Sequence, residues 1–153
     1  ARLKARLKDV TPFAVHDVSA QELQSLGISL RKAEYIKDFA DKIVSGEFEL
    51  QSVEHMSDAE AITALSSLKG IGKWTAEMIL LFCLKRPDIL SFDDLAIQRG
   101  LRMLYHHRKI TRELFNKYQK RYSPYGSTAA IYLWAIAGGA IEGMKDYAPA
   151  KKR

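Results

Sequence analysis

The stretch Leu68-Lys69-Gly70-Ile71-Gly72-Lys73-Trp74-Thr75-Ala76 constrains the fold of this chain more than any other. Apolar residues recur at helical spacing before and after it, which predicts two helices joined with almost no loop. Glycine accepts a positive φ and leaves room for another group to approach the backbone. Outward-facing amides at the start of the second helix would favour an anion such as a nucleic-acid phosphate. A Gly-x-Gly by itself is also typical of a tight turn between two helices, with the glycines as caps.

A fainter copy of this pattern lies earlier in the chain. The matching positions, at a constant offset, are Gly27, Ile28, Ala33, Glu34 and Ile36 in the first copy and Gly70, Ile71, Ala76, Glu77 and Ile79 in the second. Ser29 replaces the second glycine in the first copy, which therefore lacks the close backbone approach. We expect the first copy to be a structural helix junction without a phosphate site.

Capping signals predict further helices. Ser19 and Ser57 each open a capping box with a glutamate three residues later. The segment 91–94 can form a third box, which would place Asp94 in the first turn of a helix that ends near Tyr105. Other serine and threonine residues predict two later helices, capped by Thr111 and Ser127. No alternating pattern long enough for a strand is present. The sequence therefore predicts an all-α, compact, multi-helix fold, with residues 1–153 forming one domain.

The positive charge of the chain comes from its two ends. The net charge is +6, and residues 1–8 and 151–153 together contribute seven basic groups without an acid, so the rest of the chain carries −1. Inside the chain, residues 99–112 contain basic groups and no acid, whereas residues 47–60 contain acids and no lysine or arginine. A basic side and an acidic side would suit binding of a polyanion, although solvated helix faces give the same pattern.

Composition argues against a membrane or secreted protein. No apolar run approaches the roughly 18 residues that a membrane helix needs, and the basic start of the chain is not followed by the apolar core of a signal peptide. The single cysteine, Cys83, excludes a disulfide framework and a four-cysteine iron–sulfur cluster. We expect an intracellular protein, in the cytoplasm or nucleoid or in a nucleus, with no association with membranes.

Three motifs in order resemble one family. Residues 68–76 resemble the hairpin of the helix-hairpin-helix DNA glycosylase superfamily, and residues 91–99 resemble its catalytic-aspartate segment. Residues 122–127 and 132–134 resemble the alkylbase branch of that superfamily, the 3-methyladenine type II glycosylases. The resemblance extends over residues 19–134. Family members carry a preceding helical segment, so the resemblance implies that this chain is a C-terminal portion of the full family domain.

The resemblance aligns Asp94 with the catalytic aspartate. A carboxylate there would stabilise the positive charge that develops on the sugar carbon as an N-glycosidic bond breaks, and would orient or deprotonate the attacking water. Neighbours on a helix project about 100° apart, so Asp93 and Asp94 are not expected to form a carboxylate dyad. Without the hairpin upstream, the two acids would be interpreted as favourable charges at a helix N-terminus.

The resemblance also implies a pocket for an extruded base. Aromatic residues at Trp74 and Trp134 would line it, and a cationic alkylated purine would be attracted to an indole face by about 0.5–2 kcal/mol. Helical spacing and position suggest Met78 and Leu95 as apolar walls. Tyr125 is a further candidate that could belong either to the pocket or to the core. Both tryptophans could instead be ordinary core residues.

The hairpin would bind the DNA backbone. The residues that the resemblance assigns to DNA binding are Gly70, Ile71, Gly72, Lys73 and Thr75. It also implies a structural monovalent cation, Na⁺ or K⁺, with a DNA phosphate completing the shell of backbone carbonyls from Ser66, Leu68 and Gly70. No cofactor is expected to be required.

At the position of Trp74, bifunctional relatives carry a lysine. The amine of that lysine attacks the sugar and forms a Schiff base. Lys73 is one residue away and projects to a different face. Gly126 stands where this branch commonly has an arginine, so a charge that could contact DNA is absent. The resemblance implies a monomeric, monofunctional glycosylase without lyase activity that releases alkylated purines of the 3-methyladenine type from double-stranded DNA. The alternatives are a glycosylase for an oxidised or deaminated base, a non-catalytic DNA-binding module and a purely structural helical bundle.

Overall fold

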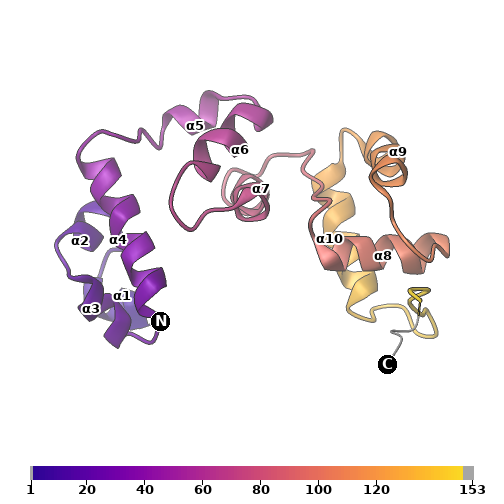
Figure 1. The fold of residues 1–153 in the computed structure, drawn as a ribbon, viewed down its shortest axis with the longest axis horizontal. Helices are drawn as coiled ribbons and strands as arrows, with labels where there is room; N and C mark the ends of the chain where they lie inside the picture. The colour runs from indigo at the N-terminus through magenta and orange to yellow at the C-terminus, as the bar shows by residue number, and fades with distance from the viewer. Residues whose placement is uncertain (1, 150–153) are drawn as a thin grey trace. The chain divides into compact units, whose positions relative to one another are not determined.

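The computed structural model describes residues 2–149, and every regular element in that range is a helix (Figure 1). The all-α prediction is therefore confirmed. The elements are α1 (Arg2–Leu7), α2 (Pro12–His16), α3 (Ala20–Ser25), α4 (Leu30–Val44), α5 (Ser52–His55), α6 (Asp58–Ser66), α7 (Lys73–Phe82), α8 (Leu95–Tyr105), α9 (Arg112–Tyr122) and α10 (Gly126–Ala137).

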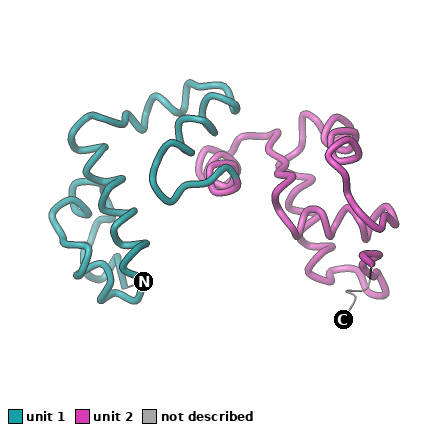
Figure 2. The backbone as a smooth tube through the Cα atoms, viewed as in Figure 1, with its two compact units in different colours: residues 1–73 teal, residues 74–153 magenta. Residues whose placement is uncertain are grey.

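The chain divides into two compact units, residues 1–73 and residues 74–153 (Figure 2). The expectation of a single domain stays a prediction. The basic C-terminal residues 151–153 lie outside the described part of the chain. Within residues 2–149, no helix combines the length and the apolar character that crossing a membrane requires.

In the first unit, α1, α2 and α3 gather around the long helix α4 (Figure 1). Apolar residues recur along α4 every three or four positions, so one face of the helix can be buried. Leu3 and Leu7 of α1 are partly buried against the core. The buried residues of this core are Val15, Val18, Leu23, Ala33 and Ala40.

Capping boxes begin α3 and α6, as the sequence predicts. The Ser19 hydroxyl accepts the Glu22 N–H at 3.1 Å, and the Glu22 carboxylate accepts the Ser19 N–H at 3.0 Å. Ser57 and Glu60 form the same reciprocal pair at the start of α6. The predicted cap of α9 by Thr111 is also confirmed. The short helix α5 has no counterpart among the predicted elements.

In the second unit, α8 and α10 pack closely against each other. Gly100 of α8 allows this approach, because a side chain there would overlap the backbone carbonyl of Leu133 on α10. Phe115 and Tyr118 bury the inner face of α9. Helices α8, α9 and α10 therefore pack together within the second unit, which also contains α7 from Trp74 onwards.

Two predicted helix starts are wrong. Ser91 does not cap α8, because its hydroxyl is buried and donates to the carboxylate of Glu77. Asp94 itself is the N-cap residue of α8 and lies just before the first turn of the helix. Ser127 lies inside α10, where its hydroxyl donates to the carbonyl of Arg86. Both serines use their hydroxyls for contacts far away in the sequence, which a local pattern does not reveal.

Candidate active site and DNA-binding turn

The turn between α6 and α7 is shaped by Gly70. Its φ of +82° lies in the left-handed region that favours glycine. A side chain at Gly70 would also overlap the ring of Tyr35 on α4. The neighbouring Lys69 pairs with Asp38 of the same helix at 2.8 Å. The turn is therefore packed onto α4 by an aromatic ring and by an ion pair.

Gly72 has a different environment. It directly precedes Lys73, the first residue of α7, and so occupies the N-cap position. A Cβ added at Gly72 would meet no described atom within 4 Å. Because glycine has no side chain that could cap the first helical turn, the position leaves room for an external acceptor. Of the other residues assigned to DNA binding, Lys73 is exposed, and Ile71 and Thr75 are partly buried.

The carbonyls expected to bind a monovalent cation lie within one short segment at the end of α6. The Leu68 carbonyl accepts the Ile71 N–H at 3.1 Å, which leaves one of its two lone pairs for another partner. Ser66 is the last residue of α6, where carbonyls lack an intrahelical partner. Gly70 carries the third carbonyl at the positive-φ turn. Three backbone oxygens are a donor set of the type that hard cations prefer, so the segment fits such an ion.

Asp94 is held by the start of α8. Its Oδ1 accepts the backbone N–H groups of Ala96 at 2.8 Å and of Ile97 at 2.9 Å. The residue is only 7% exposed. Its other oxygen, Oδ2, accepts the indole N–H of Trp74 at 2.9 Å. Three donors from two helices therefore fix the orientation of the carboxylate.

Asp93 has a different environment from Asp94. Its side chain is about half exposed, and Oδ1 lies 4.0 Å from the guanidinium of Arg112. That guanidinium also lies over the ring of Phe92, 3.6 Å from its centroid. Of the two adjacent acids, Asp94 is the one that the fold buries and orients.

The α7 helix presents a row of large side chains on one face. Trp74, Met78 and Phe82 follow one another at four-residue spacing. Trp74 is 47% exposed although its N–H is bonded, and Phe82 is also exposed. Trp134 of α10 is partly buried and stacks on Phe82, with ring centroids 5.6 Å apart and planes 13° apart. Trp134 is thus connected to the row through Phe82.

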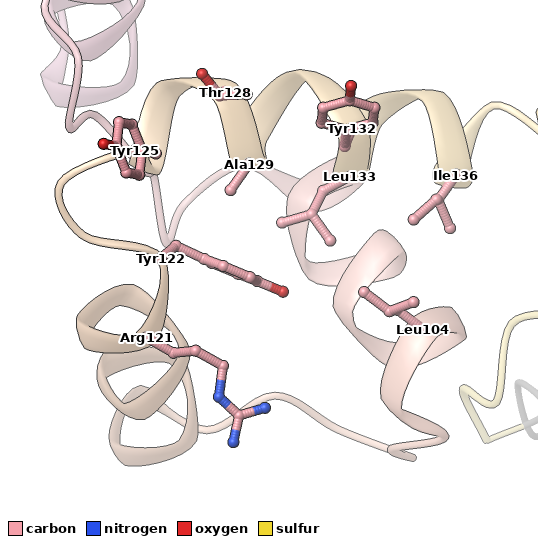
Figure 3. A pocket seen from close by; sticks show the side chains of 9 residues that line it. All are labelled: Leu104, Arg121, Tyr122, Tyr125, Thr128, Ala129, Tyr132, Leu133 and Ile136. Atoms are coloured by element: carbon pink, nitrogen blue, oxygen red, sulfur yellow. The ribbon is translucent and has the colours of Figure 1, made fainter.

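Tyr125 and Leu95 belong to other elements of the second unit than α7. Leu95, the residue after Asp94, is 79% exposed. Tyr125 borders a cavity of about 370 Å³ between α8, α9 and α10 (Figure 3). The close-up shows Arg121, Tyr122 and Leu104 on the other walls. Trp74, Met78, Leu95 and Trp134 do not line this cavity.

Gly126, which stands where the resembling branch commonly has an arginine, lies close to Asp88. Its N–H donates to Oδ1 of Asp88 at 3.0 Å, and Ser123 donates to the other oxygen of the same carboxylate. A side chain at Gly126 would overlap Asp88. Gly126 therefore allows a close contact between the start of α10 and the segment before α8.

Two features of this region are missing from the sequence-based interpretation. Phe82 could have been found, because it lies four residues beyond Met78 on the same helix face. Glu77 could have been noticed as an acid in an otherwise apolar helix, but its buried partner, Ser91, lies fourteen residues away. The pairing itself has no local signal.

Part of the predicted basic stretch is already neutralised. Arg102 forms a two-pronged ion pair with Asp146, with distances of 2.7 and 2.6 Å. The Arg102 guanidinium holds the pKa of Asp146 below its usual value. The same arginine fixes the segment after α10 onto α8.

Known proteins resemble this chain in sequence and fold. DNA-3-methyladenine glycosylase 1 of Schizosaccharomyces pombe is 36% identical over 126 residues, which are 81% of this chain and 55% of that protein. The chain spans about half the length of the curated relatives that it matches.

Two solved structures share the fold. A DNA-3-methyladenine glycosidase from Bacillus halodurans matches with a TM-score of 0.81 and 33% identity, over 95% of this chain and 69% of that one. The 3-methyladenine DNA glycosylase of Schizosaccharomyces pombe in complex with abasic DNA matches with a TM-score of 0.74 and 32% identity, over 89% of this chain and 66% of that one.

A family model described as "HhH-GPD superfamily base excision DNA repair protein" matches residues 1–124. That range contains the α6–α7 hairpin, Trp74 and Asp94. The chain belongs to the HhH-GPD superfamily of base excision DNA repair proteins.

Proposed function

We propose that this chain is the part of a monofunctional DNA glycosylase that releases alkylated purines of the 3-methyladenine type from double-stranded DNA. The observation that carries the proposal is the buried carboxylate of Asp94, oriented by two helix amides and by the indole of Trp74. The names of the relatives, DNA-3-methyladenine glycosylases, support the same class of substrate.

In the proposed reaction, the damaged base leaves the DNA stack and enters a pocket beside Asp94. Three side chains near the carboxylate would contact the base. Trp74 is bonded to Asp94 and exposed, Leu95 follows Asp94 in the chain and is exposed, and Met78 lies one turn after Trp74 on α7 and is partly buried. Trp134 would contribute through its stack on Phe82. A cationic purine favours an aromatic face by about 0.5–2 kcal/mol. We also include Tyr125, on the cavity of Figure 3, among the candidates.

The bond between the sugar carbon and the purine nitrogen breaks, and its electron pair leaves with the purine. Because an alkylated purine is cationic, it departs neutral and needs no strong general acid. The ionised Asp94 stabilises the positive charge left on the sugar. The oxygen of a water molecule then bonds to the sugar carbon, and Asp94 orients that water and takes up its proton.

The α6–α7 turn would hold the DNA backbone. Gly70, Ile71, Gly72, Lys73 and Thr75 would place backbone amides and a positive helix end against a phosphate. A Na⁺ or K⁺ ion on the carbonyls of Ser66, Leu68 and Gly70 would add positive charge at the same phosphate. Open space at Gly72 supports this arrangement.

The proposal has a direct test in base release from methylated duplex DNA. Asp94→Asn should abolish release of 3-methyladenine while binding to damaged DNA is kept. Asp93→Asn is the matched control and should keep substantial activity, because its side chain is half exposed and paired with Arg112. Equal loss in both variants, or full activity of Asp94→Asn, would remove Asp94 from catalysis. DNA binding without release of any damaged base by the unmodified chain would favour a non-catalytic module, and release of other lesions alone would change the substrate class.

The absence of lyase activity needs a separate test. The hairpin position that carries a lysine in bifunctional relatives is Trp74, and the amine of Lys69 is bonded to Asp38. Incubation with lesion-containing DNA and borohydride should trap no covalent adduct, and strands should break only after alkali. Trapping that survives Lys73→Ala and Lys69→Ala would show that another amine attacks the sugar, and the monofunctional assignment would be wrong.

A further inference from the structure

Two polar pairs connect α7 to the segment that precedes α8. The outer pair is Trp74 with Asp94. The inner pair is Glu77 with Ser91, in which the Ser91 hydroxyl donates to Oε2 of the carboxylate. Glu77 lies three residues after Trp74 on the helix, and Ser91 lies three residues before Asp94. The two pairs therefore lie side by side, with the chain segments running in opposite directions.

The inner pair is buried, whereas the outer pair reaches solvent. Ser91 is 0% exposed and Glu77 is 6% exposed, while the indole of Trp74 is almost half exposed. Burial of a carboxylate is costly unless it is hydrogen-bonded, and a well-packed apolar pair at such a site is often at least as stable. The pair fixes a specific geometry at a buried position, whatever its net contribution to stability.

The segment between the two pairs is held from the other side as well. The side-chain amide of Gln98, on α8, donates to the carbonyl of Phe92 at 2.7 Å. The ring of Phe92 packs edge-on against Phe115 of α9, with centroids 5.2 Å apart. Ser91 fixes the start of this segment to α7, and Asp94 follows three residues later.

We propose that Glu77 and Ser91 are positioning residues that hold Asp94 against the indole N–H of Trp74. Loss of the inner pair releases the segment from α7, so the outer pair no longer forms and the carboxylate loses one of its three donors. The geometric part of this proposal concerns the folded chain alone. Its consequence for catalysis rests on the proposed function.

The indole N–H of Trp74 reports the outer pair directly in a ¹H–¹⁵N NMR spectrum, with the second indole signal removed by Trp134→Phe. Asp94→Ala gives the position of the signal when the pair is broken. Ser91→Ala and Glu77→Leu should move the signal towards that position. Glu77→Gln keeps an acceptor for the Ser91 hydroxyl, so its signal should stay close to that of the unmodified chain.

Ser127→Ala is the matched control for a purely structural role. Ser127 also fixes the segment before α8, through the carbonyl of Arg86 and the N–H of Ile89, but at its far end. It should lower thermal stability without moving the Trp74 signal. An unchanged signal in folded Ser91→Ala, or an equal movement in Ser127→Ala, would overturn the positioning role. Ser91→Ala decides the question if Glu77→Leu does not fold.

Single-turnover base release then separates this inference from the proposed function. Ser91→Ala should lower the rate of release and leave the dissociation constant for damaged DNA unchanged. If the indole signal moves but the rate does not, the positioning geometry is supported and its consequence for catalysis is wrong, while Asp94→Asn tests the catalytic role of Asp94 separately. If the signal does not move, the positioning role is wrong whatever the activity.

Discussion

The junction between α3 and α4 and the junction between α6 and α7 begin alike and then differ. Each has a glycine with positive φ, at +96° for Gly27 and +82° for Gly70, followed by an isoleucine. The third residue is Ser29 in one and Gly72 in the other. The Ser29 hydroxyl accepts the N–H of Lys32 at 3.4 Å and caps α4. At Gly72 no such group exists and the space beside it is open.

The comparison separates what a tight helix junction needs from what a binding site needs. The positive-φ glycine lets the chain turn, and both junctions keep it. The side-chain cap satisfies one N–H group at the start of the helix, which stabilises the protein and occupies the place that an oxygen of a ligand would take. The second junction has no such cap, and the open space at Gly72 is where the proposed function places a DNA phosphate.

The largest effect on stability should come from replacing the positive-φ glycine that both junctions share, Gly27 in the first and Gly70 in the second. Gly70→Ala forces an L-residue into the left-handed region, at roughly 1–2 kcal/mol, and overlaps the Tyr35 ring, at roughly 1–3 kcal/mol more. Gly27→Ala should cost only the first amount, because its neighbour is the flexible end of Arg2. Denaturant unfolding measures both. Equal losses would show that the Tyr35 contact does not constrain the turn, and Tyr35→Leu should recover part of the loss in Gly70→Ala.

The next effect concerns DNA binding at Gly72, the third residue of the second junction. Gly72→Asp places a negative charge at the phosphate, and the loss of a charged hydrogen bond of about 1.5–3 kcal/mol should weaken duplex binding roughly ten- to a hundredfold. The slope of affinity against salt should fall by about 1. Aspartate is a good N-cap, so thermal stability should not fall.

Ser29→Asp is the control for that substitution, because it adds the same charge to the first junction. Fluorescence anisotropy with an undamaged duplex should show little change for it. A folded Gly72→Asp with unchanged affinity, or an equal loss in Ser29→Asp, would contradict the phosphate site at the second junction.

A smaller effect should follow from exchanging the third residues. Ser29→Gly should lower the free energy of unfolding by about 0.3 kcal/mol, and Gly72→Ser should raise it by a similar amount. Gly72→Ser should also weaken DNA binding, because the hydroxyl would compete with the phosphate. Ser29→Gly should create no new DNA binding. Calorimetry and anisotropy measure the two quantities, and tighter DNA binding by Ser29→Gly would show that an open cap alone makes a site.

The smallest effect concerns the capping boxes that begin α3 and α6. The Ser19 backbone N–H lowers the pKa of Glu22, and the Ser57 hydroxyl lowers the pKa of Glu60, both from an ordinary value of 4.5. A lowered folded pKa contributes stability above pH 4.5 that is lost as the pH falls through the folded value. Glu22→Gln and Glu60→Gln should each flatten the fall in melting temperature between neutral and acid pH. If the fall in melting temperature towards acid pH is the same in both variants as in the unmodified chain, the capping boxes do not contribute to it.

The sequence predicts the parts of this fold that depend on neighbours in the chain. Ser19, Ser57 and Thr111 cap helices through contacts three residues away, so a local pattern is enough. Ser91 and Ser127 look the same in sequence, but their partners lie at least 14 residues away, and burial decides how their hydroxyls are used. Such contacts depend on which helices pack together.

The candidate site shows the same division. The family resemblance singles out Asp94 over Asp93, and the structure buries and orients Asp94 while leaving Asp93 half exposed. The bond from Trp74 to Asp94 depends on side-chain orientation, which sequence spacing does not give. Tyr125 borders a cavity that the other candidate pocket residues do not line, because its position depends on how α8, α9 and α10 pack together.

The claim that the second junction alone binds DNA can be measured without any enzymatic activity. Amide ¹H–¹⁵N signals should be followed while a short duplex containing an abasic site is added to the full chain. The signals of Gly70, Gly72 and Lys73 should move and saturate together, and those of Gly27 and Ser29 should stay in place. Movement at the first junction with none at Gly72 would contradict the account.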